Sequence, residues 1–482
     1  MTPEQSLQAL KTYCEQQQFR GWDPYDGLNS RLFHALPLAN RSPFCRLVMI
    51  QAFKRSPINL RRLFLVPKEH NPKGIALFLQ GYCNLYRLAQ KGNTQFGTPQ
   101  EILTQIRSLA DLLISLDSRK QLNSQLSTLN TKLSGACWGY NFDWQARTGL
   151  YFPKYTPTVV ATHFAATALL DAATILNSSD ADSLAQNSQK NKTSKRSNIG
   201  NPTSSELARM TWGEGSTRQD DLGEVAQKIL KNRRPQDKDE EDSLDPRDLR
   251  EINNLREVAL SAAEFVINDL HRTPLGDGFL FSYSPLKGND TVFNASLLGS
   301  RLLAYCAHET GNDTYQQAAR ASISACCSQQ RDDGAWTYGM HPVQSWVDSF
   351  HTGYNLDALI AYQQLTGDTS FEDNIERGFN YYITHFFDPD GTPSYYDNKR
   401  YPIDIHCPAQ LLITLSRSGR FNQYRDLAQK VLNWTIQHMQ SPKGYFYYQL
   451  KQGINSRIPY MRWSNAFMFN ALTYYLLSTN SV

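Results

Sequence analysis

A short motif recurs along the second half of the chain at nearly constant spacing, and it restricts the fold more than any other feature. Asp277-Gly278, Asp333-Gly334, Asp390-Gly391 and Lys443-Gly444 are each followed by aromatic residues, and their glycines are 56, 57 and 53 residues apart. The segments between them carry apolar residues at three- and four-residue spacing, which is typical of amphipathic helices. A period of this size with two helices per unit predicts a repeat architecture in which every unit buries its apolar face against its neighbours.

The same scheme extends upstream. Trp138-Gly139-Tyr140 fits the motif 139 residues before Gly278, a distance that we interpret as one unit carrying an insertion. About six such units would close into a ring. We therefore predict an all-α protein, an α/α-toroid (a six-hairpin barrel of inner and outer helices) with short β-hairpins in the rim loops. An open helical solenoid is the alternative, but the long aromatic loops at one end of every hairpin favour the closed ring.

One stretch differs from the rest of the chain. Residues 178–245 consist mainly of Ser, Asn, Gln, Lys and Asp, and such a segment buries too little apolar surface to offset its ordering entropy. We expect a single α/α-toroid domain over residues 1–482, with 178–245 a polar, largely disordered insertion.

Composition argues against several functional classes. With 49 basic and 45 acidic residues the net charge is only +4, so we expect no nucleic-acid partner. The sequence has no phosphate-binding Gly-x4-Gly-Lys-Ser/Thr loop, no dinucleotide fingerprint and no His-Glu-x-x-His, so we expect no cofactor and no metal. The longest apolar run noted, residues 74–79, is too short to span a membrane. Eight cysteines without a Cys-x-x-Cys pair and no signal-like start favour a cytoplasmic location.

Polar residues gather about 15 positions after each repeat glycine, where the inner helix of the unit should begin. In a toroid these helices start at one rim, so their first side chains should converge on a common cavity. The Asp, Asn and Thr residues among them also have an ordinary interpretation as helix N-caps, whereas the cluster around His351 has more polar and aromatic residues than a routine helix start. The candidates for catalysis are Asp348, His351, Asp404 and His406.

Aromatic side chains mixed with amides and charges are the second signal. Aromatic rings stack on the apolar faces of sugar rings, while nearby polar groups bind hydroxyls or a uronate. Packing in a crowded loop layer is the alternative for any single ring. The candidates for substrate binding are Trp138, Tyr140, Asp143, Arg147, His163, Asn294, Trp336, Trp346, Tyr354, Tyr396 and Trp463.

These signals leave several chemistries open. Hydrolysis of a glycoside requires two carboxylates about 5–10 Å apart, for which Asp348 and Asp404 are the candidates, with His351 and His406 as partners. Epimerisation or β-elimination at a uronate would use a His or Tyr base and a neutralising Arg, such as Arg147. The alternative to an enzyme is a glycan-binding or assembly-scaffold protein that keeps the aromatic platform without the chemistry.

Four clusters together resemble one known group of proteins. Residues 21–27, 138–147, 346–355 and 401–406 are similar to those of VpsJ-type bacterial exopolysaccharide-biosynthesis proteins. The resemblance implies an α/α-toroid protein of polysaccharide assembly that binds an oligo- or polysaccharide and works beside glycosyltransferases of the same pathway. It implies no catalytic assignments.

Overall fold

The computed structural model describes residues 1–122, 132–146, 149–197 and 246–480 of the chain. These residues form two compact units. The larger unit comprises Met1–Ala173 and Leu255–Val482, and the smaller comprises Thr174–Asn254. The fold and the candidate site described below belong to the larger unit.

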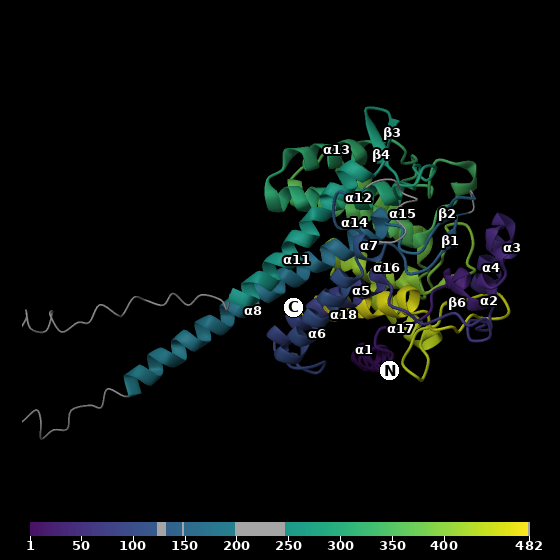
Figure 1. Ribbon diagram of the computed structural model, residues 1–482. Coiled ribbons are helices and arrows are strands. Elements are labelled where there is room, and N and C mark those ends of the chain that lie inside the picture. The colour runs from purple at the N-terminus through teal and green to yellow at the C-terminus, as the bar shows by residue number, and fades with distance from the viewer. Residues whose placement is uncertain (123–131, 147–148, 198–245, 481–482) are drawn as a thin grey trace, which may run out of the picture. The chain divides into compact units, whose positions relative to one another are not determined.

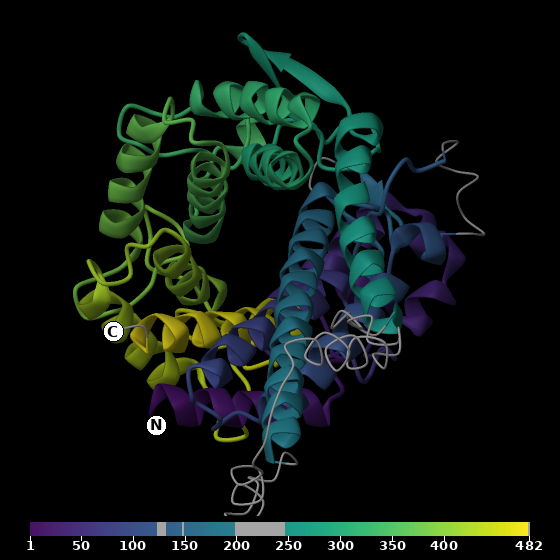
Figure 2. The ribbon, with the colours of Figure 1, turned by 90° about the vertical axis from the view of Figure 1, so that its left-hand side faces the viewer.

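The larger unit is a ring of helix pairs (Figures 1 and 2). The inner helices begin at the same rim, and they are α5 (Pro72–Gln90), α8 (Val159–Ser197), α12 (Phe293–Thr310), α14 (Ser349–Thr366), α16 (His406–Arg417) and α18 (Phe467–Thr479). Their outer partners are α6 (Pro99–Ser115), α11 (Pro246–Glu264), α13 (Asp313–Cys327), α15 (Glu372–Phe386), α17 (Arg425–Met439) and, from the start of the chain, α1 (Pro3–Gln16). Of α8 and α11, only the residues up to Ala173 and from Leu255 belong to this unit. The predicted all-α toroid is confirmed.

Contacts between neighbouring inner helices close the ring. Helix α12 packs against α14, α14 against α16, α16 against α18, and α18 against α5. The remaining place is taken by α8, whose Asp171 pairs with Arg87 of α5 and whose Val159 contacts Gly299 of α12. Helix α18 also packs against α1, so the last hairpin joins the two ends of the chain.

The repeat glycines are needed because each lies against the backbone of the next outer helix. A Cβ atom on Gly334 would lie 2.3 Å from the carbonyl oxygen of Arg377 in α15, and one on Gly391 would lie 2.5 Å from that of Lys430 in α17. Both glycines have positive φ angles, 94° and 89°. The repeat spacing in the sequence is therefore the spacing of helix-to-helix contacts around the ring.

The upstream member of this series is Gly135, which corrects the prediction of Gly139. A Cβ on Gly135 would lie 1.9 Å from the carbonyl oxygen of Ser261 in α11, as in the other repeats, whereas Gly139 lies against the loop residue Thr156. The motif of this unit is thus Gly135-Ala136-Cys137-Trp138, in which Trp138 matches Trp336 of Gly334-Ala335-Trp336.

Three two-stranded sheets lie in the loops of the described residues. Strand β1 (Trp144–Gln145) pairs with β2 (Tyr151–Phe152), and β3 (Arg272–Leu275) forms a hairpin with β4 (Gly278–Phe281). Strand β5 (Ile403–Asp404) pairs with β6 (Gln449–Leu450) from the following repeat, so this third pair links two units rather than forming a hairpin.

Smaller elements complete the larger unit. They are the 3-10 turns η1 (Asp26–Asn29) and η4 (Pro342–Gln344), the π-helical turns η3 (Phe265–Asp269) and η5 (Met461–Ala466), and the helices α2 (Arg31–His34), α3 (Pro37–Arg41), α4 (Pro43–Arg55) and α7 (Ser118–Gln121). Helices α2–α4 pack on a local core of Leu28, Phe33 and Ile50.

The predicted insertion lies partly outside the described residues. Helix α8 continues to Ser197, so the backbone of residues 178–197 is helical, and 198–245 are not described. The same helix corrects the expectation of no long apolar run. Among the described residues one stretch, Val159–Ser178, is long and apolar enough to cross a membrane, but 89 % of its most apolar window is buried in the structure, as in the core helix of a globular protein.

Candidate functional site

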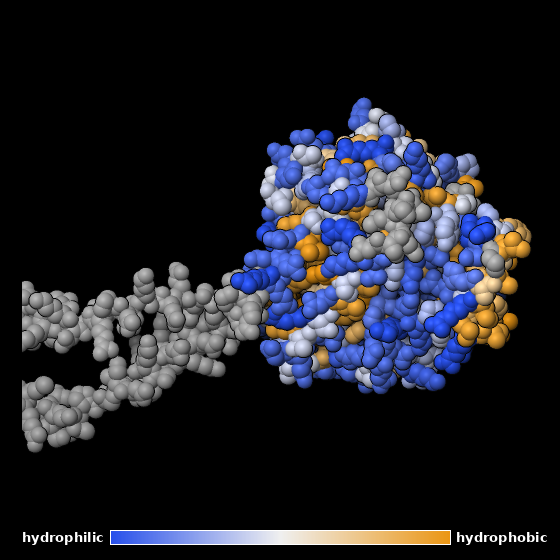
Figure 3. All heavy atoms as spheres, in the orientation of Figure 1, coloured by the Kyte–Doolittle hydropathy of each residue, from blue (hydrophilic) through white to orange (hydrophobic). Residues whose placement is uncertain are grey.

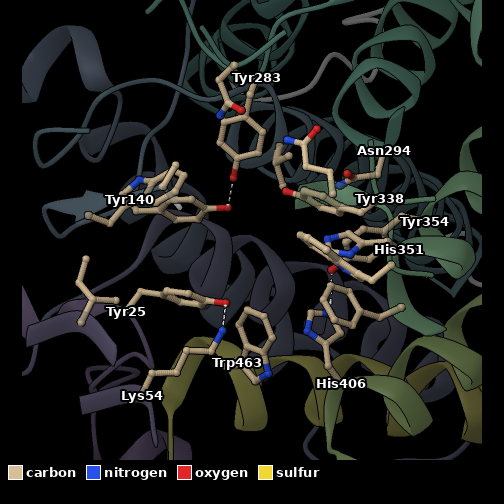
Figure 4. Close-up of a pocket in the computed structure, with 18 of the residues that line it drawn as sticks. Tyr25, Lys54, Tyr140, Tyr283, Asn294, Tyr338, His351, Tyr354, His406 and Trp463 are labelled. Atoms are coloured by element: carbon tan, nitrogen blue, oxygen red, sulfur yellow. Dashed lines mark hydrogen bonds between the residues drawn. The ribbon is translucent and has the colours of Figure 1, made fainter. Parts of the chain in front are cut away.

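A cavity of about 240 Å³ opens at the rim where the inner helices begin (Figure 4). The first turns of α5, α8, α12, α14 and α16, together with η5, contribute residues to its wall, and so do the aromatic rim loops. Its size is slightly below the roughly 300–1,000 Å³ of drug-sized ligand pockets, which suits one or two sugar rings. Convergence of separate repeats on one cavity is what the sequence predicted.

A carboxylate–imidazole pair lies at the start of α14. Asp348 caps the helix by accepting a hydrogen bond from the backbone N–H of His351 at 3.0 Å, and its other oxygen lies 2.7 Å from Nδ1 of the same histidine. Asp348 is buried, whereas His351 lines the cavity. A carboxylate that holds the Nδ1 hydrogen leaves Nε2 as an unprotonated acceptor, which is the arrangement of a general base.

A second polar chain runs from α5 to α16 through a tyrosine. Lys73 Nζ donates to the hydroxyl of Tyr354 at 3.1 Å, and that hydroxyl lies 2.7 Å from Nε2 of His406. Burial raises the pKa of Tyr354 and lowers those of His406 and Lys73. The phenol therefore keeps its proton, and the imidazole of His406 is neutral, so this chain can supply a proton from Tyr354.

Tyrosine hydroxyls point into the cavity from several sides (Figure 4). The hydroxyls of Tyr140 and Tyr283 lie 3.1 Å apart, and Tyr25 accepts a hydrogen bond from Lys54 Nζ at 2.7 Å. Burial raises the pKa values of Tyr140 and Tyr283, so both phenols are neutral. They present donors and acceptors that match the hydroxyl groups of a sugar.

Flat aromatic surfaces lie between these hydroxyls. Trp346 stacks on Tyr338 with ring centroids 4.6 Å apart, and both line the cavity. Trp463 lines it from η5. Asn294 contributes a buried Oδ1 that has no hydrogen-bond partner among the described residues, so this atom is free to accept a bond from a ligand.

Two buried ion pairs lie at and behind the cavity wall that Arg462 helps to form. Arg462 donates two hydrogen bonds to Asp23, at 2.6 and 2.8 Å, and Arg61 pairs with Asp26 at 2.6 Å. Burial disfavours the charged guanidinium of Arg462, but Asp23 outweighs this effect and the pKa of Arg462 is raised. The first pair fixes the loop of residues 21–27 against η5, and the second fixes the same loop to the segment that follows α4. Both carboxylates of this loop, Asp23 and Asp26, are therefore held in ion pairs.

Asp404 has a structural position. It is fully buried and accepts hydrogen bonds from the His406 backbone N–H at 3.0 Å, from Trp463 Nε1 at 2.8 Å and from Gln449 Nε2 at 2.6 Å. Burial raises its pKa to about 6, although these hydrogen bonds oppose the shift. Asp404 holds Trp463 and caps α16 behind the wall, so the structure corrects its predicted position at the cavity.

Eight of the fifteen predicted site residues line the cavity, six do not, and one lies outside the described residues. Those that line it are Tyr140, Asn294, Trp346, His351, Tyr354, Tyr396, His406 and Trp463. Asp348 and Asp404 lie behind it. Trp138 and Trp336 are core residues, whose indoles donate to the backbone oxygens of Leu113 and Cys326.

Three further predicted residues fall elsewhere. Asp143 accepts a hydrogen bond from the Lys154 backbone N–H in the β1–β2 region, and it does not line the cavity. His163 is buried on α8 with its Nδ1 unpartnered by any described residue. Burial lowers its pKa, so it is a neutral core histidine. Arg147 lies outside the described residues.

Sequence reasoning missed several wall residues, including Tyr25, Lys54, Lys73, Tyr283, Tyr338 and Arg462. One of them carried a local signal. Asn71 caps α5 by accepting from the Gly74 N–H at 3.3 Å, with Pro72 at the first helical position. An Asn-Pro pair marks the N-terminus of a helix, and Lys73 follows it directly.

The described wall of the cavity has no Asp or Glu side chain but includes Lys54, Lys73 and Arg462. Nor do the described residues contain a group of three or more His, Cys, Asp or Glu side chains arranged to hold a metal ion. The arrangement offers an oriented imidazole, a protonated phenol and cationic groups, which suits proton transfer on an anionic ligand.

No protein-family model matches the chain, and no curated protein is similar enough to match. Several solved structures are similar. The GH76 α-mannanase of Bacteroides thetaiotaomicron aligns with 85 % of this chain and 87 % of its own, with a TM-score of 0.47 and 11 % identity. A sugar epimerase from a ruminal bacterium aligns with 86 % of this chain and 90 % of its own, with a TM-score of 0.47 and 11 % identity. The unsaturated glucuronyl hydrolase of Bacillus sp. GL1 aligns with 46 % of this chain and 69 % of its own, with a TM-score of 0.37 and 14 % identity. Likenesses at this level of identity carry no function to this chain.

Proposed function

We propose that this protein is a carbohydrate-active enzyme that moves a proton at a carbon atom of a sugar bound in the cavity, by epimerisation or β-elimination. The observation that carries the proposal is the Asp348–His351 pair, 2.7 Å apart at the cavity wall. Hydrolysis by two carboxylates is the weaker candidate because no described wall residue is acidic.

In this proposal His351 is the base and Asp348 is its positioning residue. Nε2 of His351 takes the proton from the sugar carbon next to a carboxylate, and Tyr354 gives a proton back. Tyr354 lies on the same helix as His351, with ring centroids 6.0 Å apart, so it faces the same side of the sugar. For epimerisation the returned proton instead comes to the opposite face of the same carbon from a hydroxyl across the cavity, such as that of Tyr140 (Figure 4). For elimination the proton of Tyr354 goes to the oxygen of the leaving sugar as the carbon–oxygen bond breaks. Positioned proton transfer of this kind contributes about 10²–10⁴-fold to a rate.

The charge of the wall favours a uronate as the substrate. Removal of a proton beside a carboxylate builds negative charge, which cationic groups stabilise. Arg462 and Lys54 line the cavity. Lys73 lies next to Tyr354, and although burial lowers its pKa, a bound carboxylate would favour its ammonium form. The tyrosine and tryptophan rings between them supply stacking surfaces for pyranose rings.

The biological setting rests on the sequence resemblance to VpsJ-type proteins. On that basis the enzyme acts in the cytoplasm on an oligosaccharide or precursor of a bacterial exopolysaccharide, beside the glycosyltransferases that assemble it. Deletion of the encoding gene should then change the uronate composition of the polymer or stop its production.

Deuterium exchange tests the chemistry directly. The protein is incubated in D₂O with defined uronate-containing and matched neutral oligosaccharides, and incorporation at each carbon is followed by NMR and mass spectrometry. We expect either deuterium only at the carbon next to the carboxylate, from epimerisation, or a new C=C bond at that carbon without deuterium, from elimination. Either product should be lost in His351→Gln and kept in His438→Gln, which changes an exposed histidine on α17. Tight binding of uronates without exchange, elimination or epimerisation would instead favour the non-catalytic glycan-binding protein. New reducing ends with neither deuterium at a carbon nor a new C=C bond would favour a hydrolase.

A further inference from the structure

Exposed apolar side chains are concentrated in one short segment of the chain. Eight of the thirteen large hydrophobic residues that are exposed in the described part of the chain lie within residues 32–65. Leu38 is 86 % exposed and Phe44 is 74 % exposed. Figure 3 shows an apolar region on the side where Figure 1 labels α2, α3 and α4. The set is Leu32, Leu36, Leu38, Phe44, Val48, Ile58, Leu63 and Leu65.

Helix α4 is apolar on both of its faces. Ile50 and Phe53 are buried on one face. Phe44, Val48 and Ala52 follow one another at four-residue spacing on the other face and are exposed. A surface helix normally turns its second face to water with polar residues. Contiguous exposed apolar surface of this kind marks a site of interaction with a protein or a membrane.

The same segment is strongly and exclusively basic. Residues 27–68 contain eight Lys and Arg residues and no Asp or Glu, so the rest of the chain holds the other 41 basic and all 45 acidic residues. The net charge of +4 therefore comes from this segment alone. Four of its arginines are exposed, namely Arg31, Arg41, Arg55 and Arg62. We call these arginines and the eight apolar residues the basic apolar surface.

We propose that the basic apolar surface binds this protein to a membrane that contains anionic lipids. Side chains such as Leu and Phe enter the boundary between headgroups and acyl chains, while arginines pair with lipid phosphates, as in other interfacial helices. Charge argues against the obvious alternative, a second copy of this chain. A symmetric contact would bring the arginines of one copy against the same arginines of the other.

Membrane binding through this surface would also hold the cavity near the lipid headgroups. Helix α4 carries Phe44 and Val48 on its outward face, whereas Gln51 and Lys54, farther along the same helix, line the cavity. Docking through α2–α4 therefore brings the rim of the ring close to the lipid headgroups. A saccharide carried on a membrane lipid would meet the cavity there. The membrane inference does not depend on which reaction the cavity performs.

Vesicle flotation tests the proposal with the full chain. The protein is mixed with phosphatidylcholine vesicles with or without 30 mol % phosphatidylglycerol, at low and high salt. We expect binding to the anionic vesicles, weaker binding at high salt, and little binding to phosphatidylcholine alone. The double change Arg41→Glu and Arg55→Glu should weaken binding about tenfold or more. The matched control, Lys430→Glu and Lys443→Glu on and after α17, changes the net charge equally and should have no such effect.

The apolar part is tested separately. Leu38→Ser combined with Phe44→Ser should reduce binding at least as strongly, whereas Ile454→Ser, which removes a 73 % exposed side chain elsewhere, should not. Circular dichroism and the unfolding transition check that all variants fold. The proposal is wrong if wild-type protein does not float with anionic vesicles, or if both surface variants float as well as wild type. It is also wrong if the protein is a dimer that Leu38→Ser and Phe44→Ser dissociate without any vesicle binding by wild type.

Discussion

His351 Nδ1 lies 2.7 Å from Oδ2 of Asp348, three residues earlier, and the other oxygen of this carboxylate caps the helix that carries the histidine. One side chain therefore fixes both the start of α14 and the orientation of the imidazole. Trp346 Nε1 donates to the same Oδ2 at 2.9 Å. The carboxylate thus also positions an aromatic ring of the cavity wall. A single buried residue, Asp348, therefore orients both the imidazole of His351 and the indole of Trp346.

Replacing Asp348 by Asn should lower activity with little effect on folding. Asn is as good an N-cap as Asp, but its amide N–H₂ cannot accept the Nδ1 hydrogen, so the imidazole is no longer held with Nε2 free. We expect proton transfer to fall about 10²–10⁴-fold, and the pH profile of the remaining activity to change. His351→Gln should give at least the same loss. A variant Asp348→Asn with full activity and an unchanged pH profile would contradict the positioning role.

Asp404 should affect stability in a pH-dependent way and activity only slightly. Burial raises its pKa in the folded protein to about 6, above the value of about 3.9 expected when unfolded. Between pH 4 and pH 6 the folded state binds more protons, so this group's contribution to stability is present at low pH and is lost as the pH rises.

The test compares Asp404→Asn with wild type by urea unfolding. The free energy of unfolding of the variant relative to wild type should increase by about 2 kcal/mol from pH 4.5 to pH 7. Asp332→Asn, at an exposed position, serves as the control and should show no such change. Activity of Asp404→Asn should stay within about fivefold of wild type, since the residue does not reach the cavity.

The sequence was sufficient to predict the ring of helix pairs, but it predicted only part of the candidate site. Each of the glycines at 278, 334, 391 and 444 lies against the backbone of an outer helix, so their regular spacing in the sequence directly reflects the ring of helix pairs. The same pattern did not separate Gly135 from Gly139, because both lie within three residues of Trp138 and only the close approach of Gly135 to Ser261 distinguishes them.

Orientation was the part that sequence could not supply. His351 and Asp348 stand together in the sequence, yet the imidazole faces the cavity and the carboxylate faces the helix backbone. Trp336 and Trp346 have the same chemistry, but one fills a space beside Gly378 of α15 and the other lines the cavity. Lys73 comes from a helix more than 270 residues before Tyr354, a contact that only ring closure creates.

Lys73→Met should stabilise the fold and weaken the binding of anionic sugars. Lys73 is buried among the rings of Phe164, Tyr354 and Phe467, and burial lowers its pKa. Met fills a similar volume without a charge, so we expect about 1–3 kcal/mol more stability at pH 7. The gain should shrink as the pH rises through about 10.4, the pKa of an unfolded lysine, because above that pH both states hold the neutral amine.

The binding effect of this change is measured by titration calorimetry with a uronate and a matched neutral sugar. Affinity for the uronate should fall about tenfold or more, and that for the neutral sugar much less. Lys54→Met, at a partly buried lysine of the same cavity, is the control for stability and should not show the gain. Equal losses for both sugars would contradict the proposed carboxylate contact.

Gly334→Ala should destabilise the ring more than Gly311→Ala. Both glycines have positive φ, 94° and 69°, so each substitution carries a backbone cost of about 1 kcal/mol. A Cβ on Gly311 meets nothing within 4 Å, whereas one on Gly334 would lie 2.3 Å from a carbonyl oxygen of α15. We expect about 1 kcal/mol for Gly311→Ala and about 2–4 kcal/mol for Gly334→Ala, measured by chemical unfolding. Equal costs would mean that α15 moves away freely.

Trp336 and Trp346 separate packing from binding because they occupy different sides of the same rim. Trp336 is buried and donates to the Cys326 carbonyl at 3.0 Å, so Trp336→Ala leaves a cavity in the core and should cost about 3–5 kcal/mol of stability. Trp346 is stacked on Tyr338 at the cavity wall, so Trp346→Ala should cost less than about 2 kcal/mol but weaken sugar binding about three- to tenfold. Unfolding curves and sugar titrations of both variants, at a temperature where both are folded, decide the matter. The aromatic platform is contradicted if Trp346→Ala binds sugars as wild type does, and the core role of Trp336 is contradicted if its removal costs no more than that of Trp346.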